Sequence, residues 1–169
     1  MASSTWHDKI KLLKIYFIFF FIFPYFFLDR VSKIYILNIA NNEELNIYIN
    51  DFLNIILIWN TGIGFGLLSF KDNTVYNSIT FLILLINFVL IYIALKSDNL
   101  KRILFIIILG GSSGNLFDRF YYSAVPDFID INYNGFHWFV FNVADIFITI
   151  GIICLIFIEI LAYNKKSDQ

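Results

Sequence analysis

The most constraining feature of this sequence is a series of long apolar runs, and the run TVYNSITFLILLINFVLIYIAL at residues 74–95 shows it most clearly. About 20 consecutive apolar residues are enough to cross the hydrocarbon core of a bilayer as a helix. Only 15% of the residues are charged, against about a quarter in soluble domains. We therefore predict an α-helical membrane protein that forms one domain over residues 1–169. Its transmembrane helices are predicted at about 11–29, 74–95, 103–121 and 141–163.

Residues 29–73 differ in composition from the predicted helices, because Asn, Asp and Glu interrupt short aliphatic runs. The segments 45–49 and 55–59 have the length and the β-branched content of strands. This composition favours a small β-sheet on the outer membrane surface over another transmembrane span.

Lysine and arginine residues are unevenly distributed between the two ends of the predicted helices. They cluster before the first helix, in the turn at 96–102 and at the C-terminus, whereas none lies between residues 121 and 145. The positive-inside rule therefore places both termini in the cytoplasm and the sheet on the opposite side. No small-x-small cleavage pattern follows the first apolar run, so we expect this helix to be retained rather than removed as a signal peptide.

The stretch 110–145 joins the third and fourth predicted helices and concentrates the ionisable groups. Ionisable side chains at membrane depth are costly and are therefore functional candidates. Asn115, Asp118 and Arg119 have the i, i+3, i+4 spacing of one helix face, and Asn142 and Asp145 are likewise three residues apart. Because lipid offers no polar partner, these groups must face each other or a water-filled groove.

Three roles are open for the aspartates of this stretch. Asp118 beside Arg119 is most simply half of an ion pair or the anchor of a helix end. A transporter or proton-coupled carrier would need charges along the spans, where only Glu159 lies well inside, and its flux would depend on Asp145 or Glu159. A non-enzymatic assembly factor is a further alternative function, in which none of these aspartates would matter for turnover.

The third role is catalysis by a pair of carboxylates. Two carboxylates a few ångströms apart in a poorly hydrated site do not both ionise readily, so one keeps its proton near neutral pH. The ionised partner then takes a proton from water while the protonated one polarises a peptide carbonyl. Spacing alone does not select the pair among Asp118, Asp127, Asp130 and Asp145.

Other chemistries have less support in the sequence. Two distant histidines, His7 and His137, and the single Cys154 in an apolar run give little basis for a zinc site. Ser112 and Ser113 have no histidine or lysine base at a predictable position. The net charge of −1 gives no electrostatic case for nucleic acid.

Five short motifs follow one another in order along nearly the whole chain: DRVSK at 29–33, NTGIGFG at 60–66, GSSGNLFDR at 111–119, VPDFID at 125–130 and FNVAD at 141–145. In this order and at these intervals they resemble the motifs of the lipoprotein signal peptidase (signal peptidase II) family, the bacterial membrane aspartyl proteases. The sequence departs from the family pattern at Arg30, where Gln is common, at Ile63-Gly64, where two alanines are usual, and at Pro126, where Val is typical. None of these departures involves a carboxylate.

The resemblance implies a role for each polar residue of the motifs. It implies that Asp127 and Asp145 form the catalytic dyad and that Asp118 is structural. It implies a small extracytoplasmic β-cradle from the region of about 34–70 and a loop over the site at about 122–140. The residues that it implies for substrate placement and support are Asn60, Gly62, Asn115, Arg119, Asn142, Asp29 and Lys33.

The resemblance also implies the substrate and the setting. The substrate would be a prolipoprotein that carries diacylglycerol on its lipobox cysteine, cleaved just before that cysteine. The enzyme would be a monomer in contact with membrane lipid in the bacterial inner membrane, with its active site at the outer face. It would need no cofactor and no metal, and it would bind no nucleic acid.

Overall fold

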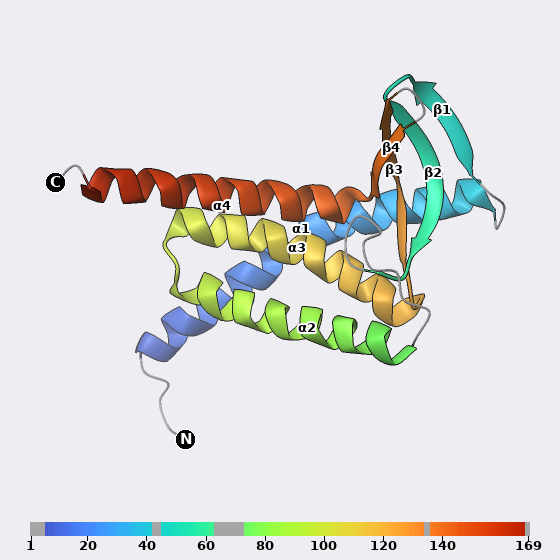
Figure 1. Ribbon diagram of the computed structural model, residues 1–169. Coiled ribbons are helices and arrows are strands. Elements are labelled where there is room, and N and C mark those ends of the chain that lie inside the picture. The colour runs from blue at the N-terminus through green and yellow to red at the C-terminus, as the bar shows by residue number, and fades with distance from the viewer. Residues whose placement is uncertain (1–5, 42–44, 63–72, 134–135, 168–169) are drawn as a thin grey trace.

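The computed structural model describes residues 6–41, 45–62, 73–133 and 136–167. It shows long helices that lie alongside one another and a small sheet at the end opposite the termini (Figure 1). The elements are α1 (Trp6–Ala40), β1 (Asn46–Asn50), β2 (Leu53–Asn60), α2 (Asn73–Lys96), α3 (Asn99–Tyr121), β3 (Val125–Tyr133), β4 (Phe136–Phe141) and α4 (Val143–Ser167).

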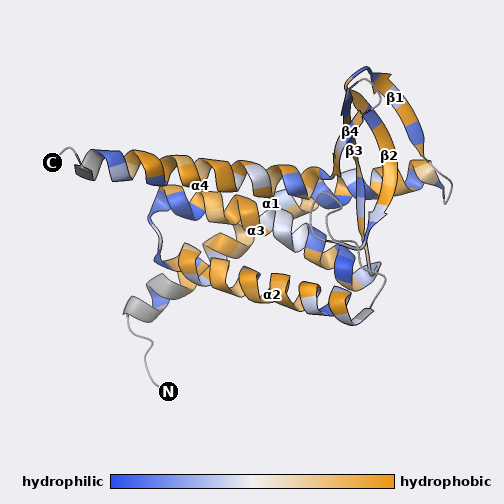
Figure 2. Ribbon diagram, viewed as in Figure 1, coloured by the Kyte–Doolittle hydropathy of each residue, from blue (hydrophilic) through white to orange (hydrophobic). Residues whose placement is uncertain are grey.

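The described part of the chain holds four helices that are long and apolar enough to cross a membrane. Hydrophobic residues extend along the helices (Figure 2), and many of their large side chains point outward: Phe20 is 72% exposed, and Phe88 and Phe157 are each 61% exposed. Such apolar surfaces would be costly in water, whereas the lipid tails solvate them. Together with the four-stranded sheet, this confirms the predicted fold class.

The first helix is longer than predicted. It extends beyond the predicted end at about residue 29 and into the β region predicted from about 34; both bounds are wrong, because α1 continues to Ala40. The added segment contains no Pro or Gly and places Asp29, Lys33, Ile36 and Ala40 on one buried face at helical spacing. The residue after the helix, Asn41, has a φ of 43°, the left-handed conformation that commonly follows a helix.

Helix α3 is the centre of the helical layer and packs against α1, α2 and α4. Its glycines permit this close approach. A Cβ added at Gly111 would lie 2.4 Å from the backbone oxygen of Ala144, and one added at Gly114 would lie 2.3 Å from Oδ2 of Asp29. Small residues at such crossings let membrane helices pack backbone to backbone, and here they bring α1 and α4 against α3 near the sheet.

The strands form one antiparallel sheet in the order β1-β2-β3-β4. The strands predicted at 45–49 and 55–59 correspond to β1 and β2. The segment 122–140, expected as a loop, instead contains β3 and β4 in its described residues. Side chains alternate between the two faces of a strand, and in β3 the polar Asp130 and Asn132 are buried while Ile131 and Tyr133 are 43% and 53% exposed. β3 also pairs with β2, a partner strand that the sequence of the segment alone does not indicate. The predicted β region at 63–70 lies outside the described residues.

Candidate active site

The structure brings Asp127 of β3 and Asp145 of α4 together around the side chain of Asn142. Asn142 Nδ2 donates to Asp127 Oδ1 over 2.5 Å, and Asn142 Oδ1 accepts from the backbone N–H of Asp145 over 3.2 Å. The two aspartates are buried, with exposed fractions of 2% and 7%. Of the four aspartates that spacing left open, these two are the pair that shares a bridging side chain.

The first turn of α4 positions Asp145. Asn142 stands at the N-cap, and Asp145 is three residues further on. The backbone N–H of Asn142 donates to Asp145 Oδ2 over 3.2 Å, in return for the bond from the backbone of Asp145 to Asn142. This reciprocal pattern is a capping box. It satisfies two N–H groups that the helix leaves free and holds the carboxylate of Asp145 at the mouth of the helix.

Asparagines present an amide N–H to each carboxylate of the pair, and each amide is fixed in orientation by a donor on its oxygen. The N–H of Gly62 donates to Asn60 Oδ1 over 2.8 Å, so Asn60 Nδ2 faces Asp127 Oδ2, also at 2.8 Å. Lys33 Nζ donates to Asn115 Oδ1 over 2.8 Å, so Asn115 Nδ2 faces Asp145 Oδ1, again at 2.8 Å. Asn142 follows the same rule. The carboxylates are therefore held by side chains that cannot flip without losing a bond.

The carboxyl group of Asp127 has an altered acidity. Its burial, together with the negative charge of Asp145, raises the pKa of Asp127 from 3.8 to about 7, although the bonds from Asn142 and Asn60 oppose the shift. A carboxyl group in this range exists in both protonated and ionised forms near neutral pH. The pair can thus offer one acid and one base at the same time.

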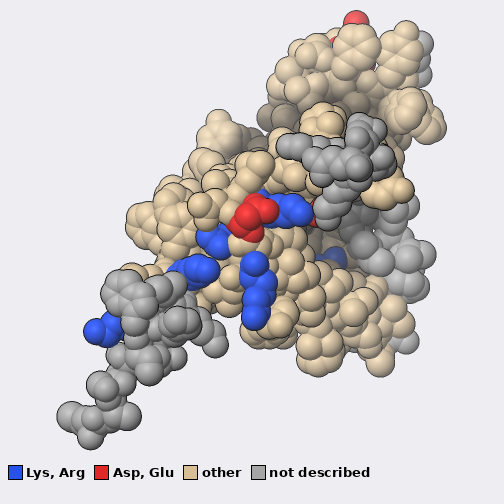
Figure 3. Space-filling model, turned by 90° about the vertical axis from the view of Figure 1, so that its left-hand side faces the viewer, with Lys and Arg blue, Asp and Glu red and all other residues tan. Residues whose placement is uncertain are grey.

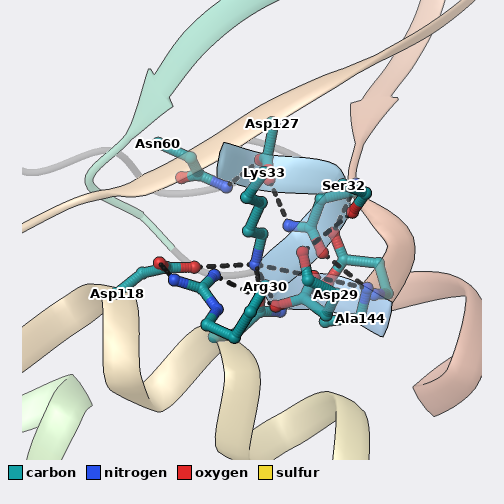
Figure 4. A network of polar contacts seen from close by, with 11 residues as sticks. Asp29, Arg30, Ser32, Lys33, Asn60, Asp118, Asp127 and Ala144 are labelled. Carbon is teal, nitrogen blue, oxygen red and sulfur yellow. Dashed lines mark hydrogen bonds and ion pairs between the residues drawn. The ribbon is translucent and has the colours of Figure 1, made fainter. Parts of the chain in front are cut away.

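Below the pair, four charged side chains form a buried cluster at the junction of α1 and α3 (Figure 4). Lys33 Nζ lies 2.9 Å from Asp29 Oδ1 and 2.7 Å from Asp118 Oδ2. Arg30 lies 3.1 Å from Asp29 and 2.6 Å from Asp118. Two cations thus balance two carboxylates. Asp29 also accepts from the backbone N–H of Ala144 over 3.0 Å, which ties the cluster to the start of α4.

This cluster changes two expectations from the sequence. Asp118 does form an ion pair, but its partners are Arg30 and Lys33 rather than Arg119. Adjacent residues on a helix point about 100° apart, so Arg119 faces α2 instead. Arg30 was noted only as a departure from a motif and was not predicted as a site residue. The i, i+4 spacing of Asp29 and Lys33 was the signal that could have indicated the buried face.

Arg119 supports the segment after β2. Its guanidinium stacks over the Tyr76 ring, with 5.3 Å from Cζ to the ring centroid, and Nη2 donates to the backbone oxygen of Gly62. Since Gly62 in turn donates to Asn60, Arg119 acts on Asp127 through the backbone. The remaining predicted residues of the NTGIGFG motif, 63–66, lie outside the described part of the chain.

Comparisons with known proteins place this arrangement in a family. The sequence profile described as "Signal peptidase (SPase) II" matches residues 21–161. The chain belongs to the signal peptidase II family.

Individual relatives agree over most of their length. The chain is 52% identical over 163 residues to a lipoprotein signal peptidase of Pelagibacter ubique, covering 96% of this chain and 98% of the relative. It is 36% identical over 145 residues to that of Anaplasma phagocytophilum, covering 83% and 88%. A solved structure described as a bacterial membrane enzyme, determined by the in meso method at 2.3 Å, superposes with a TM-score of 0.69 at 27% identity, covering 100% of this chain and 98% of the other.

As a signal peptidase II, the chain is a membrane peptidase, and a large groove leads from its carboxylate pair into the helices. The groove has a volume of about 580 Å³. Its polar end holds Asp127 and Asp145 with the asparagines that contact them, and its walls are aliphatic side chains of α2, α3 and α4. The lining residues of the walls include Ile83, Ile86, Leu90, Ile108, Ile148 and Ile152.

Two acidic residues that the sequence left open lie apart from this groove in the peptidase. Asp130 is fully buried within the sheet and contacts His137 Nδ1 at 2.8 Å. Glu159 pairs with Lys101 at the other end of the helices, and its side chain is 63% exposed. A carrier would need Glu159 to lie inside the helices on a route for protons or ions, whereas this residue forms an ion pair at the surface. The structure therefore does not support Glu159 as a transport group.

Proposed function

We propose that this chain is an aspartic endopeptidase that removes the signal peptide from diacylglyceryl-modified prolipoproteins, cleaving just before the lipidated cysteine. One observation carries the proposal: two buried carboxylates, bridged by one asparagine, stand at the mouth of an apolar groove. The names of the relatives support the class of substrate. Asp127 and Asp145 are the catalytic pair.

The proposed reaction uses one protonated and one ionised carboxyl group. Asp145 takes a proton from a water molecule as the water oxygen bonds to the peptide carbon, and Asp127 gives its proton to the carbonyl oxygen. The resulting diol then collapses: the C–N bond breaks, the leaving nitrogen takes the proton from Asp145, and Asp127 recovers a proton from a diol hydroxyl. The pKa of Asp127 near 7 supports its role as the proton donor, since an acid of this strength works efficiently near neutral pH.

The groove suits a substrate with an apolar peptide segment beside a lipidated residue. Aliphatic walls receive apolar groups without exposing them to water, while the scissile amide lies at the polar end. Asn60, Asn115 and Asn142 orient the carboxylates by the bonds described above. Gly62 and Arg119 hold Asn60, while Asp29 and Lys33 hold α4 and Asn115; all four thus support the site from behind.

The proposed setting is the bacterial inner membrane, with both termini in the cytoplasm. The sheet and the start of α4 lie at the end of the helices opposite the termini (Figure 1), and these elements carry Asp127 and Asp145. Lysine and arginine residues gather at the terminal end, which the positive-inside rule assigns to the cytoplasm. The pair therefore faces the outer surface, where the lipidated cysteine lies, and one chain contains all groups that the proposed reaction requires.

A gel-shift assay in detergent tests the proposal. The purified protein is incubated with a diacylglyceryl-modified prolipoprotein, and Asp127→Asn and Asp145→Asn are compared with the wild type. We expect each substitution to lower cleavage by at least about 100-fold, since general acid and base groups contribute roughly 100- to 10,000-fold. Size-exclusion elution and thermal unfolding establish that the variants are folded.

Asp51→Asn is the matched control, because Asp51 is an exposed carboxylate in the turn between β1 and β2. This variant should cleave the substrate as the wild type does. Normal cleavage by either dyad variant would refute the assignment and direct attention to Asp118 or Asp130. Absence of cleavage by the wild type, across several lipid conditions, would refute the proposed substrate.

A further inference from the structure

A second cavity lies between α1 and α3, toward the end that carries the chain termini and away from the carboxylate pair. Its volume is about 470 Å³. Its walls combine apolar side chains from both helices with two cations and one amide. The lining residues are Leu13, Lys14, Phe17, Asn99, Arg102 and Ile103.

Arg102 is held in this cavity by three hydrogen bonds. Its Nε donates to the backbone oxygen of Ala94 over 3.1 Å and its Nη1 to Asn99 Oδ1 over 2.9 Å. Its Nη2 donates to the backbone oxygen of Ser97. All three acceptors are neutral, and no carboxylate pairs with Arg102 among the described residues. Since a guanidinium has five N–H donors, two remain for a ligand.

Lys14 supplies the second charge. It is exposed, and within the described part of the chain it has no hydrogen bond or ion pair. Two other basic residues of this end make contacts elsewhere: Lys101 pairs with Glu159, and Lys96 lies over the Tyr92 ring at 5.7 Å. Lys and Arg gather over this face of the molecule, with only a small acidic patch among them (Figure 3). The cavity therefore has an excess of positive charge.

The apolar walls of the cavity belong to the lipid-facing surface of the helices. Leu13, Phe17 and Ile103 are 67%, 42% and 46% exposed, and they lie within the candidate spans that begin at Leu12 and Asn99. A soluble anion would use only the cations of this site. A molecule with a phosphate joined to acyl chains would use both the cations and the apolar walls.

We infer that this cavity binds an anionic phospholipid. The phosphate accepts hydrogen bonds from the two remaining N–H groups of Arg102 and from Lys14 Nζ, and one acyl chain lies along Leu13, Phe17 and Ile103. Basic pockets at the ends of transmembrane helices hold anionic headgroups in this way. The site lies near the first residues of α3, whereas the carboxylate pair is reached from its last turns, so its occupant is not the substrate of the peptidase.

Native mass spectrometry tests the inference with the full chain in detergent. The protein is mixed with equal amounts of dioleoyl-phosphatidylglycerol and dioleoyl-phosphatidylcholine, which share acyl chains and differ in net charge. About fivefold in affinity is expected from each cation near a headgroup. We expect the wild type to prefer the anionic lipid by roughly 25-fold, Lys14→Gln to lower this preference about fivefold, and Lys14→Gln with Arg102→Gln to abolish it.

Lys96→Gln is the matched control, because Lys96 is an exposed cation of the same end that does not line the cavity; its preference should equal that of the wild type. An equal loss in this control would show a diffuse surface attraction and overturn the site. Equal binding of the two lipids by the wild type would also overturn it. Competition by sn-glycero-3-phosphoglycerol at the same concentration as the lipid would show that the acyl chain contributes nothing, which would refute a lipid as the occupant.

Discussion

Replacing Asp127 with asparagine should change how the stability of the fold depends on pH, independently of any activity. In the wild type, burial and the charge of Asp145 raise the pKa of Asp127 from 3.8 to about 7. Between these two pH values the folded chain keeps a proton that the unfolded chain has released. The free energy of unfolding therefore falls as the pH rises through this window.

The size of this effect follows from the shift itself. A shift of about 3 units, at about 1.4 kcal/mol per unit, corresponds to roughly 4 kcal/mol. This is the amount by which ionisation of Asp127 destabilises the folded state above pH 7, relative to a pH below 4. Since Asp127 is only 2% exposed, solvent screens little of it. Asparagine resembles the protonated acid and does not ionise. The free energy of unfolding of Asp127→Asn should therefore fall less between pH 4 and pH 8 than that of the wild type.

Denaturant titrations of the purified protein in detergent, followed by intrinsic fluorescence at pH 4, 6 and 8, measure this difference. The wild type should lose about 4 kcal/mol more than Asp127→Asn between pH 4 and pH 8. Asp51→Asn serves as the control for the loss of any one carboxylate, because Asp51 is exposed; its profile should follow that of the wild type. Parallel profiles for the wild type and Asp127→Asn would refute the argument that burial sets the acidity of this group.

Other substitutions test the packing and the buried charges. Lys33→Met leaves two buried carboxylates with one cation, so it should destabilise the protein by about 3–5 kcal/mol, and a thermal midpoint equal to that of the wild type would contradict the cluster. Gly111→Ala places a Cβ 2.4 Å from the backbone oxygen of Ala144 and should clearly lower the thermal midpoint. Ser113→Ala in the same helix is the control and should leave the midpoint unchanged. Equal midpoints for both variants would contradict the close packing of α3 and α4. Asn87 is 6% exposed, and neither of its amide atoms has a hydrogen-bond partner among the described residues. Asn87→Leu should therefore stabilise the protein by about 1–3 kcal/mol, which denaturant titration would detect as a raised midpoint. A lowered midpoint would show that the amide is needed.

The helices were the most predictable part of the protein. Runs such as 74–95 are apolar over the length of a bilayer, and the hydrophobicity of a run can be read from its own residues. An apolar segment in lipid must form a helix, because every backbone polar group has to be satisfied within the segment. The helix ends were less predictable. α1 passes its predicted end because Asp29 and Lys33, which look like solvent-exposed residues in the sequence, face a buried partner on α3.

The candidate site was only partly visible in the sequence. Spacing placed Asn142 and Asp145 on one turn, and the capping box there is a local feature. That Asp127, rather than Asp130, meets this turn depends on the register between β2 and β3, where Asp127 lies opposite Ile58 across a bulge. The resemblance to a family named the pair; composition and spacing did not.

The sequence by itself determined that this chain spans a membrane four times and carries its polar motifs at the segment between the last two spans, because hydrophobic length and charge are properties that each segment has on its own. Only the tertiary structure decided which polar groups meet. The meeting of Asp127 with Asp145 and of Asp118 with Arg30 and Lys33 requires helices and strands far apart in the chain to pack against one another. That packing buries Asp127 and places it near Asp145, and both effects raise the pKa of Asp127.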